Sequence, residues 1–184
     1  LLMYLNHEIR ITGDGSRTLW LTDLKESYHS IHGAYAESQH VFIDNGLDRV
    51  KNDNIKILEI GYGTGLNCFL SGVYANTNKK NIEYTGIELY PLPEEINSLL
   101  KYDELINKTH HRLYNMISDA SWGEKVGVSD YFIIEKLQED FITFITKTCF
   151  DVVFFDAFAP EKQIELWTDD VFEKIYGFLE TGGL

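Results

Sequence analysis

Cysteine is scarce in this sequence, and that scarcity excludes several kinds of protein. The chain holds two cysteines in 184 residues, Cys68 and Cys149, and both lie in apolar runs. Their spacing fits neither a disulfide framework nor a zinc site, which favours a reducing, cytoplasmic setting. Apolar runs of about 18 residues are also lacking, so we expect no membrane span. Residues 1–4 lack the basic and apolar segments of a secretory signal.

Basic residues are scarce as well. The 16 Lys and Arg residues face 29 Asp and Glu residues, which gives a formal net charge of -13. Proteins that bind nucleic acid through its phosphates use clustered Lys and Arg, and this sequence has no such cluster. The charge therefore argues against a large nucleic-acid footprint on this chain. The share of hydrophobic residues, 44%, is that of a globular domain.

The first 54 residues predict a small extension before the main domain. Residues 7–11 and 17–21 alternate apolar and polar positions around an Asp14-Gly15 turn, which predicts a hairpin. Residues 27–40 are rich in His, Ser, Gly and Tyr and lack a clean period. We expect them to form a structured loop with short helical pieces, so residues 1–54 are interpreted as an N-terminal hairpin and lid extension.

From residue 55 the pattern alternates between strands and helices. Strands are predicted at 55–60, 82–88, 131–134 and 151–156, and helices at 66–74, 93–100, 104–117, 141–145 and 168–179. This alternation predicts a Rossmann-like α/β domain over residues 55–184, with a parallel sheet and helices on both faces. Another strand is expected where the chain ends, so we expect C-terminal strands of the sheet to be missing from this chain.

A glycine-rich turn follows the first predicted strand. Gly61, Gly63 and Gly65 form a G-x-G-x-G pattern, with Glu59 two residues before it. A dinucleotide fingerprint would need its third glycine at position 66, where Leu66 stands, and this disfavours NAD. The observed pattern is typical of class I methyltransferases, in which Glu59 would attract the ammonium of the methionine moiety of S-adenosyl-L-methionine.

Two further acidic residues belong to the next strands. Glu88 ends the second strand, where an acidic residue accepts hydrogen bonds from both ribose hydroxyls of a nucleotide-like ligand. An acidic residue after the third strand often meets the adenine amino group in this fold. Glu135 is the candidate for that role, and a solvated charge is an equal alternative for it.

Asp156 follows the apolar fourth strand and therefore emerges at the same sheet edge as the glycine turn. A carboxylate there can hold a nucleophilic amine and take up its proton. Methyl transfer is an in-line displacement, so positioning of the amine supplies much of the catalysis. Phe158 and Trp167 are interpreted as packing around the substrate or the cationic sulfonium, with covering of the sheet end as the alternative.

Four segments of the sequence carry a more specific signal. They are LEIGYGTGLN at 58–67, GIELYPL at 86–92, FFDAFAPEKQIELW at 154–167 and ESYHSIHGAYAESQHVF at 26–42. Together they resemble the methyltransferase domain of the MnmC family, in its stand-alone form without the FAD domain. The resemblance implies methylation of the primary amine of 5-aminomethyl-2-thiouridine at the tRNA wobble position. It also implies tRNA as partner and a FAD-dependent oxidoreductase on a separate chain.

The motifs and the resemblance together give a set of expected site residues. The cofactor is expected to be S-adenosyl-L-methionine and the catalytic residue Asp156. The expected cofactor-binding residues are Glu59, Gly61, Tyr62, Gly63, Thr64, Gly65, Asn67, Glu88, Asp156 and Ala157. The expected substrate and lid residues are Tyr28, His29, Glu37, Phe158, Pro160 and Trp167.

Other interpretations stay open. The residues His29, His32, Glu37 and His40 match no standard zinc spacing, so no metal is expected. A methyltransferase for an amine on a small molecule or a protein would suit the acidic composition better than a tRNA enzyme. A non-catalytic module that binds S-adenosyl-L-methionine and regulates a partner is the third alternative.

Overall fold

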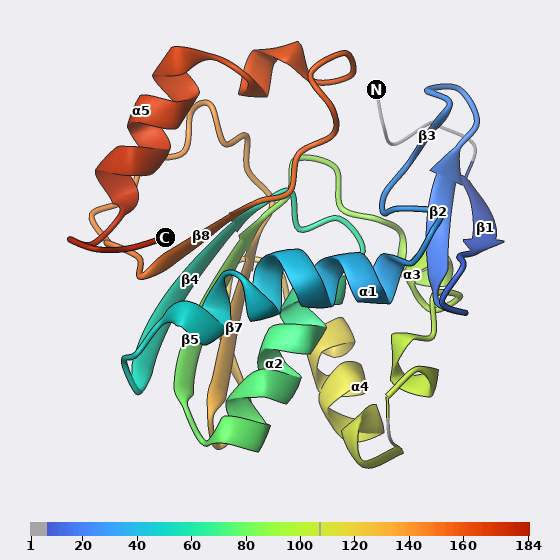
Figure 1. Ribbon diagram of the computed structural model, residues 1–184, viewed down its shortest axis with the longest axis horizontal. Coiled ribbons are helices and arrows are strands. Elements are labelled where there is room, and N and C mark those ends of the chain that lie inside the picture. The colour runs from blue at the N-terminus through green and yellow to red at the C-terminus, as the bar shows by residue number, and fades with distance from the viewer. Residues whose placement is uncertain (1–6, 107) are drawn as a thin grey trace.

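The computed structural model describes residues 7–106 and 108–184, which form an α/β fold around a five-stranded sheet (Figure 1). The strand order is β6-β7-β5-β4-β8. Their bounds are β4 Asn54–Ile60, β5 Asn81–Ile87, β6 Lys125–Ser129, β7 Phe132–Leu137 and β8 Val152–Phe155. The Rossmann-like arrangement expected from the sequence is confirmed, because β7, β5, β4 and β8 are parallel and helices cover both faces of the sheet.

The expectation of a purely parallel sheet was wrong. Strand β6 pairs with β7 in the antiparallel direction, so the sheet is mixed. Strand β6 was not predicted within the polar segment 103–129, because it lies at the sheet edge and buries only one of its five residues. An edge strand that is mostly exposed lacks the apolar alternation by which strands are recognised.

Helices connect the strands and cover the sheet. Their bounds are α1 Ala34–Ser38, α2 Leu66–Asn78, α3 Glu94–Asn97, α4 His111–Asp119 and α5 Asp169–Phe178. A six-residue π-helix, η2 Gln39–Asp44, continues α1, and short 3-10 turns are η3 Leu47–Arg49, η4 Tyr102–Glu104, η5 Lys108–His110 and η6 Ile164–Leu166. Across the described ranges, no helix has both the length and the apolar character needed to cross a bilayer.

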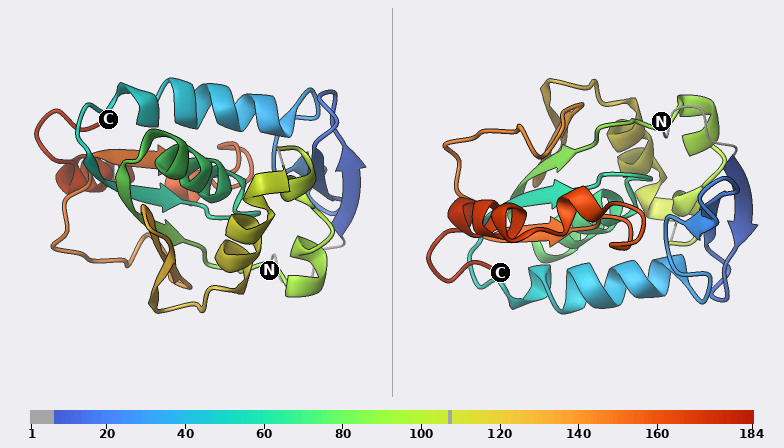
Figure 2. Two further views of the ribbon diagram at one scale, coloured as in Figure 1. Left: turned by 90° about the horizontal axis from the view of Figure 1, so that it is seen from below. Right: turned by 90° about the horizontal axis from the view of Figure 1, so that it is seen from above.

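Alternate residues of β4 face two different layers of the molecule. Ile55 and Ile57 are buried in a core that also contains residues of α2 and α4. Leu58 and Ile60 are buried on the opposite face, where α5 packs. Figure 2 shows this layering, with α2 and α4 over the sheet from below and α5 over it from above. The two apolar faces fix the strand register, because a one-residue slip would exchange them.

The N-terminal hairpin is confirmed. Strands β1 His7–Ile11 and β2 Arg17–Leu21 pair in the antiparallel direction, and β3 Glu26–Ser27 adds to β2. Leu19 of β2 and Ala34 of α1 are fully buried in the same core as α2. The hairpin turn also contacts α1, because the carboxylate of Asp14 accepts a hydrogen bond from the backbone amide of Ala36 at 2.8 Å. This extension is therefore packed onto the sheet domain.

Several predictions for helices differ from the structure. The helix predicted at 104–117 begins later, since α4 starts at His111 after the short turns η4 and η5. The helix predicted at 141–145 was wrong, since this segment forms turns. The ammonium of Lys174 binds the carbonyl oxygens of Phe141 at 2.7 Å and Ile142 at 2.8 Å, so tertiary contacts replace helical hydrogen bonds there. The predicted cap of α5 is confirmed, because Thr168 Oγ1 accepts a hydrogen bond from the Val171 amide at 3.3 Å. The helix ends before the predicted glycine stop.

Candidate functional site

A pocket of about 500 Å³ lies at the carboxyl ends of β4, β5 and β8. Strand β4 pairs on one side with β5, the next strand of this sheet along the chain, and on the other side with β8. This is the point at which the strand order reverses, where open α/β sheets bind their ligands. Residues 26–42 of the N-terminal extension close the other side of the pocket. Its volume is in the usual range of a small-molecule site.

The glycine turn needs its glycines for two reasons. The backbone φ angles are +88° at Gly61, +48° at Gly63 and +74° at Gly65, a region that favours glycine. Neighbouring atoms also leave no room for side chains. A Cβ on Gly61 would meet the backbone carbonyl of Asp156, and a Cβ on Gly63 would lie 3.1 Å from the ring of Tyr28. The turn therefore brings the other walls of the pocket close to its own backbone.

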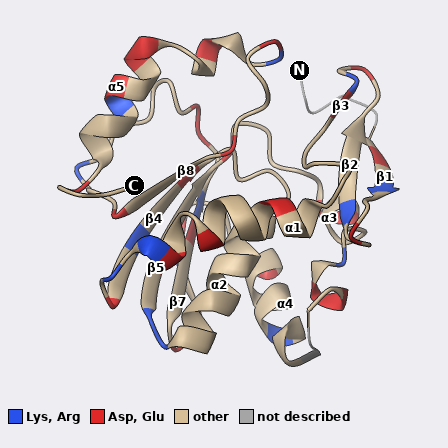
Figure 3. Ribbon diagram, in the orientation of Figure 1, with Lys and Arg blue, Asp and Glu red and all other residues tan. Residues whose placement is uncertain are grey.

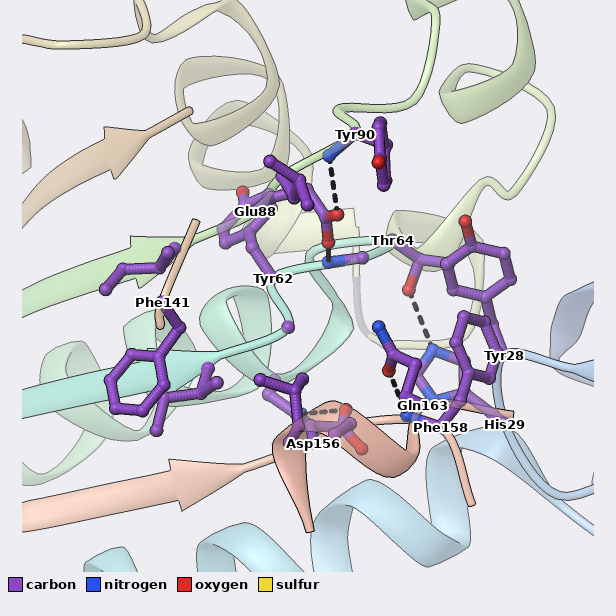
Figure 4. A pocket seen from close by; sticks show the side chains of 18 of the residues that line it. Tyr28, His29, Tyr62, Thr64, Glu88, Tyr90, Phe141, Asp156, Phe158 and Gln163 are labelled. Carbon is purple, nitrogen blue, oxygen red and sulfur yellow. Dashed lines mark hydrogen bonds between the residues drawn. The ribbon is translucent and has the colours of Figure 1, made fainter. Parts of the chain in front are cut away.

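Glu88 lies directly after β5 and is held by backbone amides (Figure 4). Its Oε2 atom accepts a hydrogen bond from the amide of Gly63 at 2.9 Å, and its Oε1 atom accepts one from the amide of Tyr90 at 2.9 Å. A carboxylate offers about four acceptor positions, so each oxygen retains capacity for a ligand hydroxyl. Glu88 thus presents an oriented pair of acceptors to the pocket.

Two other carboxyl groups share one side-chain amide. The Nδ2 atom of Asn67, in the first turn of α2, donates to Glu59 Oε1 at 2.8 Å and to Asp156 Oδ2 at 2.8 Å. Glu59 is fully buried and does not line the pocket. Burial raises the pKa of Glu59 well above its ordinary value, the nearby Asp156 raises it further, and the hydrogen bond from Asn67 opposes this. Glu59 is therefore linked to the pocket residue Asp156 both by charge and by the hydrogen bonds of Asn67.

Asp156 faces the pocket in a different environment. Burial raises the pKa of its carboxyl to about 7, against the hydrogen bond from Asn67 and with added repulsion from Glu37 and Glu88. A carboxyl group that titrates near neutral pH can both accept and return a proton under ordinary conditions. Asp156 is therefore the group in this pocket that is suited to proton transfer.

Aromatic side chains enclose the pocket beside Asp156. The ring of Tyr28 packs edge-on against Phe158, with 5.1 Å between the ring centroids. The amide of Phe158 donates to Oε1 of Gln163 at 2.8 Å, and Gln163 itself lines the pocket. Burial raises the pKa of Tyr28, and the charge of Glu88 adds to this, so its hydroxyl stays neutral.

His29 joins the N-terminal extension to the glycine turn. Its Nε2 atom forms a hydrogen bond of 2.7 Å with Oγ1 of Thr64. Burial lowers the pKa of His29 to about 4, so the ring is neutral at pH 7. Glu37 also lines the pocket, and its Oε2 atom accepts a hydrogen bond from the Ser30 amide at 2.7 Å. The first bond joins the lid segment to the turn, and the second lies within the lid segment.

The structure brings most of the expected site residues into one pocket. The expected residues that line it are Tyr28, His29, Glu37, Gly61, Tyr62, Gly63, Thr64, Asn67, Glu88, Asp156, Ala157 and Phe158. Glu59, Gly65, Pro160 and Trp167 do not line it. Trp167 instead packs edge-on against Phe155 and donates from Nε1 to the carbonyl of Phe158 at 2.8 Å. It supports the pocket wall from outside.

The sequence placed the acidic residue of the third strand too early. Glu135 lies within β7, which continues to Leu137, and it does not line the pocket. The acidic residues at that strand end are Glu139 and Asp140, which line the pocket together with Phe141. The sequence gives no clear signal for this longer strand, because the buried position near its end is the charged residue Lys136.

Within residues 7–106 and 108–184, no three His, Cys, Asp or Glu side chains gather as metal ligands would. The histidines of the N-terminal segment have other surroundings. His29 binds Thr64, and the backbone carbonyl of His40 accepts a hydrogen bond from Asn45 Nδ2 at 2.7 Å.

Comparisons with known proteins point to one class. Residues 109–184 match a family model described as S-adenosyl-L-methionine-dependent methyltransferase. The chain is 29% identical over 184 residues to an uncharacterized protein of Methanocaldococcus jannaschii, covering 97% of this chain and 49% of that protein. It is 25% identical over 182 residues to the tRNA 5-methylaminomethyl-2-thiouridine biosynthesis bifunctional protein MnmC of Campylobacter fetus, covering 92% of this chain and 28% of that protein.

A solved structure shows the same relationship. The crystal structure of MNMC2 from Aquifex aeolicus matches with a TM-score of 0.74 and 28% identity, covering 97% of this chain and 58% of that chain. The fold is Rossmann-like, and residues 109–184 match the model of S-adenosyl-L-methionine-dependent methyltransferases. Over most of its length the chain is similar to MnmC proteins and to the MNMC2 structure. The chain spans half or less of the length of these curated relatives.

Proposed function

We propose that this chain methylates the primary amine of 5-aminomethyl-2-thiouridine at the tRNA wobble position. One observation carries the chemistry: Asp156, a carboxyl group with a pKa of about 7, faces the same pocket as the glycine turn and Glu88. The choice of substrate is supported by similarity to proteins named for 5-methylaminomethyl-2-thiouridine biosynthesis.

The pocket residues fit S-adenosyl-L-methionine. Glu88 has free acceptor capacity for two ribose hydroxyls, and the turn at Gly61 and Gly63 excludes side chains beside it. Acidic residues at the strand ends, Glu139 and Asp140 among them, give the pocket a charge that suits a cation. S-adenosyl-L-methionine, when bound, supplies an electrophilic methyl group.

Asp156 prepares the acceptor amine in this proposal. A protonated amine has no free lone pair, so it must lose a proton before it can attack a methyl group. The ionised carboxylate of Asp156 accepts that proton and holds the neutral amine in line for attack. Tyr28 and Phe158 exclude water from this side of the pocket and confine the amine.

We assign the parts of the chain accordingly. Residues 1–54 form the hairpin and lid extension, and residues 55–184 form the domain that binds S-adenosyl-L-methionine. The proposed partner is tRNA. Glu37 belongs to the lid, because it lines the pocket from α1.

A second candidate is methylation of an amine on a small molecule or a protein. One observation favours it: the formal net charge is -13, and Lys and Arg are scattered over separate elements in the view of Figure 3. Clustered positive charge is the usual footprint of a protein that binds nucleic acid. The two candidates therefore differ in the acceptor molecule and share the chemistry of the pocket.

Labelled methyl transfer separates these candidates. The full chain is incubated with methyl-labelled S-adenosyl-L-methionine and either tRNA that carries 5-aminomethyl-2-thiouridine or a tRNA-free cell extract. We expect label in the modified wobble nucleoside, detected by mass spectrometry after digestion, and none in a matched tRNA that lacks the aminomethyl group. Label in metabolites or proteins alone would establish the second candidate. Binding of the cofactor without any transfer would indicate a non-catalytic module.

A further inference from the structure

Asn67 occupies a position between two carboxyl groups that belong to neighbouring strands. Glu59 lies on β4 and Asp156 follows β8, and these strands pair directly. The side-chain amide nitrogen of Asn67 donates to both carboxyl groups at 2.8 Å. The Asn67 residue is 1% exposed, so this contact is buried. One amide group therefore links the motif glutamate to the carboxylate of the pocket.

We propose that Asn67 is a positioning residue that directs the Asp156 carboxylate toward the pocket, and that buried Glu59 acts by holding Asn67 in place. This inference rests on the proposed function, because it concerns the group that accepts the proton. It gives Glu59 a role without contact to ligand, which agrees with its absence from the pocket wall.

The two hydrogen bonds of the Asn67 amide restrict the orientation of its side chain. A side-chain amide has two donor hydrogens, and both are used here. Rotation of the Asn67 amide would remove both bonds and point its oxygen at two acidic groups. A buried acidic group left without its donor costs more free energy than an ordinary hydrogen bond contributes. Glu59, fixed in the middle of the sheet, therefore restricts Asn67, and Asn67 restricts Asp156.

The charges around Asp156 make the hydrogen bond from Asn67 important for its ionisation. Asp156 faces Glu37 from α1, Glu88 after β5 and the buried Glu59 of β4, and Tyr102 of η4 also interacts with its charge. Each of these groups is acidic or neutral, so none of them stabilises the ionised form by charge. The hydrogen bond from Asn67 lowers the pKa of Asp156, whereas burial and the carboxylates raise it. Loss of this donor should therefore make Asp156 harder to ionise.

A titration of the ligand-free full chain tests the inference without relying on activity. Carbon-13 labelled aspartate reports each carboxyl group by NMR, and Asp156→Asn identifies the signal of Asp156. We expect Asn67→Ala to raise the pKa of Asp156 by about 1, because one donor to the ionised form is lost. Asn67→Ser, with a smaller change in volume, should shift it in the same direction. Circular dichroism verifies that each variant is folded.

Ser71→Ala is the matched control. Ser71 lies one turn further along α2 and is fully buried, so its truncation makes a comparable change in packing. We expect no change in the titration of Asp156 in this variant.

Two substitutions at Glu59 test its indirect role. Glu59→Gln keeps an oxygen that accepts from Asn67, so we expect a nearly unchanged titration of Asp156 and unchanged cofactor affinity. Glu59→Leu removes that acceptor and should reproduce the effect of Asn67→Ala. Loss of cofactor affinity in Glu59→Gln would show direct contact with the ligand and overturn the inference.

One defined result would contradict the positioning role of Asn67. An unchanged pKa of Asp156 in folded Asn67→Ala and Asn67→Ser would remove Asn67 from the positioning role. A failure of the proposed function looks different, because it would be seen as absent methyl transfer by the unaltered chain while the Asp156 titration still responded to Asn67. The two failures are therefore distinguishable.

Discussion

The pocket has two halves that are built in different ways. The strand-end half consists of the turns after β4, β5 and β8, and it carries Glu88 and Asp156. The N-terminal half is formed by residues 26–42, which lie far from those strands in sequence. The first half is shaped by local backbone rules, such as positive φ at glycine and amides that point at a carboxylate. The second half depends on packing against the first.

The two halves also contribute different groups. The strand-end half presents Glu88 and Asp156, whereas the N-terminal half adds Glu37 and places the neutral groups of Tyr28 and His29 against them. Changes in the strand-end half should therefore affect chemistry and cofactor affinity. Changes in the N-terminal half should affect how well the pocket is closed and how stable the closed arrangement is. Four experiments test this division.

The largest effect is expected at Asp156. Asp156→Asn should lower kcat by about 10³-fold, because the variant cannot accept a proton, while affinity for S-adenosyl-L-homocysteine survives. In the unaltered chain, the rate should rise as pH increases through about 7, where the carboxyl ionises. Steady-state kinetics and calorimetry measure both effects, and Asp170→Asn on the exposed start of α5 is the control. A nearly normal rate would remove Asp156 from the mechanism.

The next effect concerns stability and belongs to the N-terminal half. His29 has a folded pKa of about 4 and an ordinary value of 6.5, so the unfolded chain binds more protons between these pH values. The contribution of His29 to the free energy of unfolding should therefore be fully present above pH 6.5 and should be lost as the pH decreases toward 4. From pH 7 to pH 4.5 the loss due to His29 should be roughly 2–3 kcal/mol.

Urea unfolding of the unaltered chain and of His29→Gln isolates this contribution, because the other titrating groups are common to both. The unaltered chain should lose more stability on acidification than the variant does. His32→Gln, at an exposed position three residues away, should behave like the unaltered chain. Equal acid sensitivity of His29→Gln and the unaltered chain would contradict the buried, neutral state of His29.

Glu88 gives a smaller effect on binding. Glu88→Ala should weaken S-adenosyl-L-homocysteine binding roughly tenfold to a hundredfold, because acceptors for two hydroxyls are lost. Calorimetry measures the affinity directly. Glu83→Ala is the matched control on the same strand, since Glu83 is exposed and its carboxylate meets Lys125 at 3.2 Å outside the pocket. Equal affinities in the two variants would separate Glu88 from cofactor binding.

The smallest effect is expected at Tyr28. Tyr28→Ala removes the ring that packs on Phe158 and should raise KM for the amine substrate by about tenfold or less. Tyr28→Phe keeps the ring and should retain nearly normal kinetics. Unchanged kinetics in Tyr28→Ala would show that the N-terminal half does not close the pocket during turnover.

The sequence predicted the strand-end half in detail and the N-terminal half in outline. The glycine turn, Glu88 and Asp156 were predicted correctly as neighbours, because the carboxyl ends of parallel strands meet at one edge. Strand β6 and the turns at 141–145 were missed, since an exposed edge strand has no clear alternation and Lys174 satisfies carbonyls that a helix would otherwise pair. Asp140 lies outside the four segments that carried the resemblance, and Gln163 lies inside one of them without having been singled out, so both were assigned to the pocket only in the folded chain.

Local backbone rules and apolar periodicity were enough to determine the alternating strands and helices, the hairpin and the glycine turn, because each depends on residues close together in the chain. Tertiary structure alone decided that His29 binds Thr64, that Tyr28 covers Gly63, and that Asn67 bonds both Glu59 and Asp156. These contacts join segments far apart in sequence. Their distances and burial set the pKa values and the reach of each group, and no single segment encodes them.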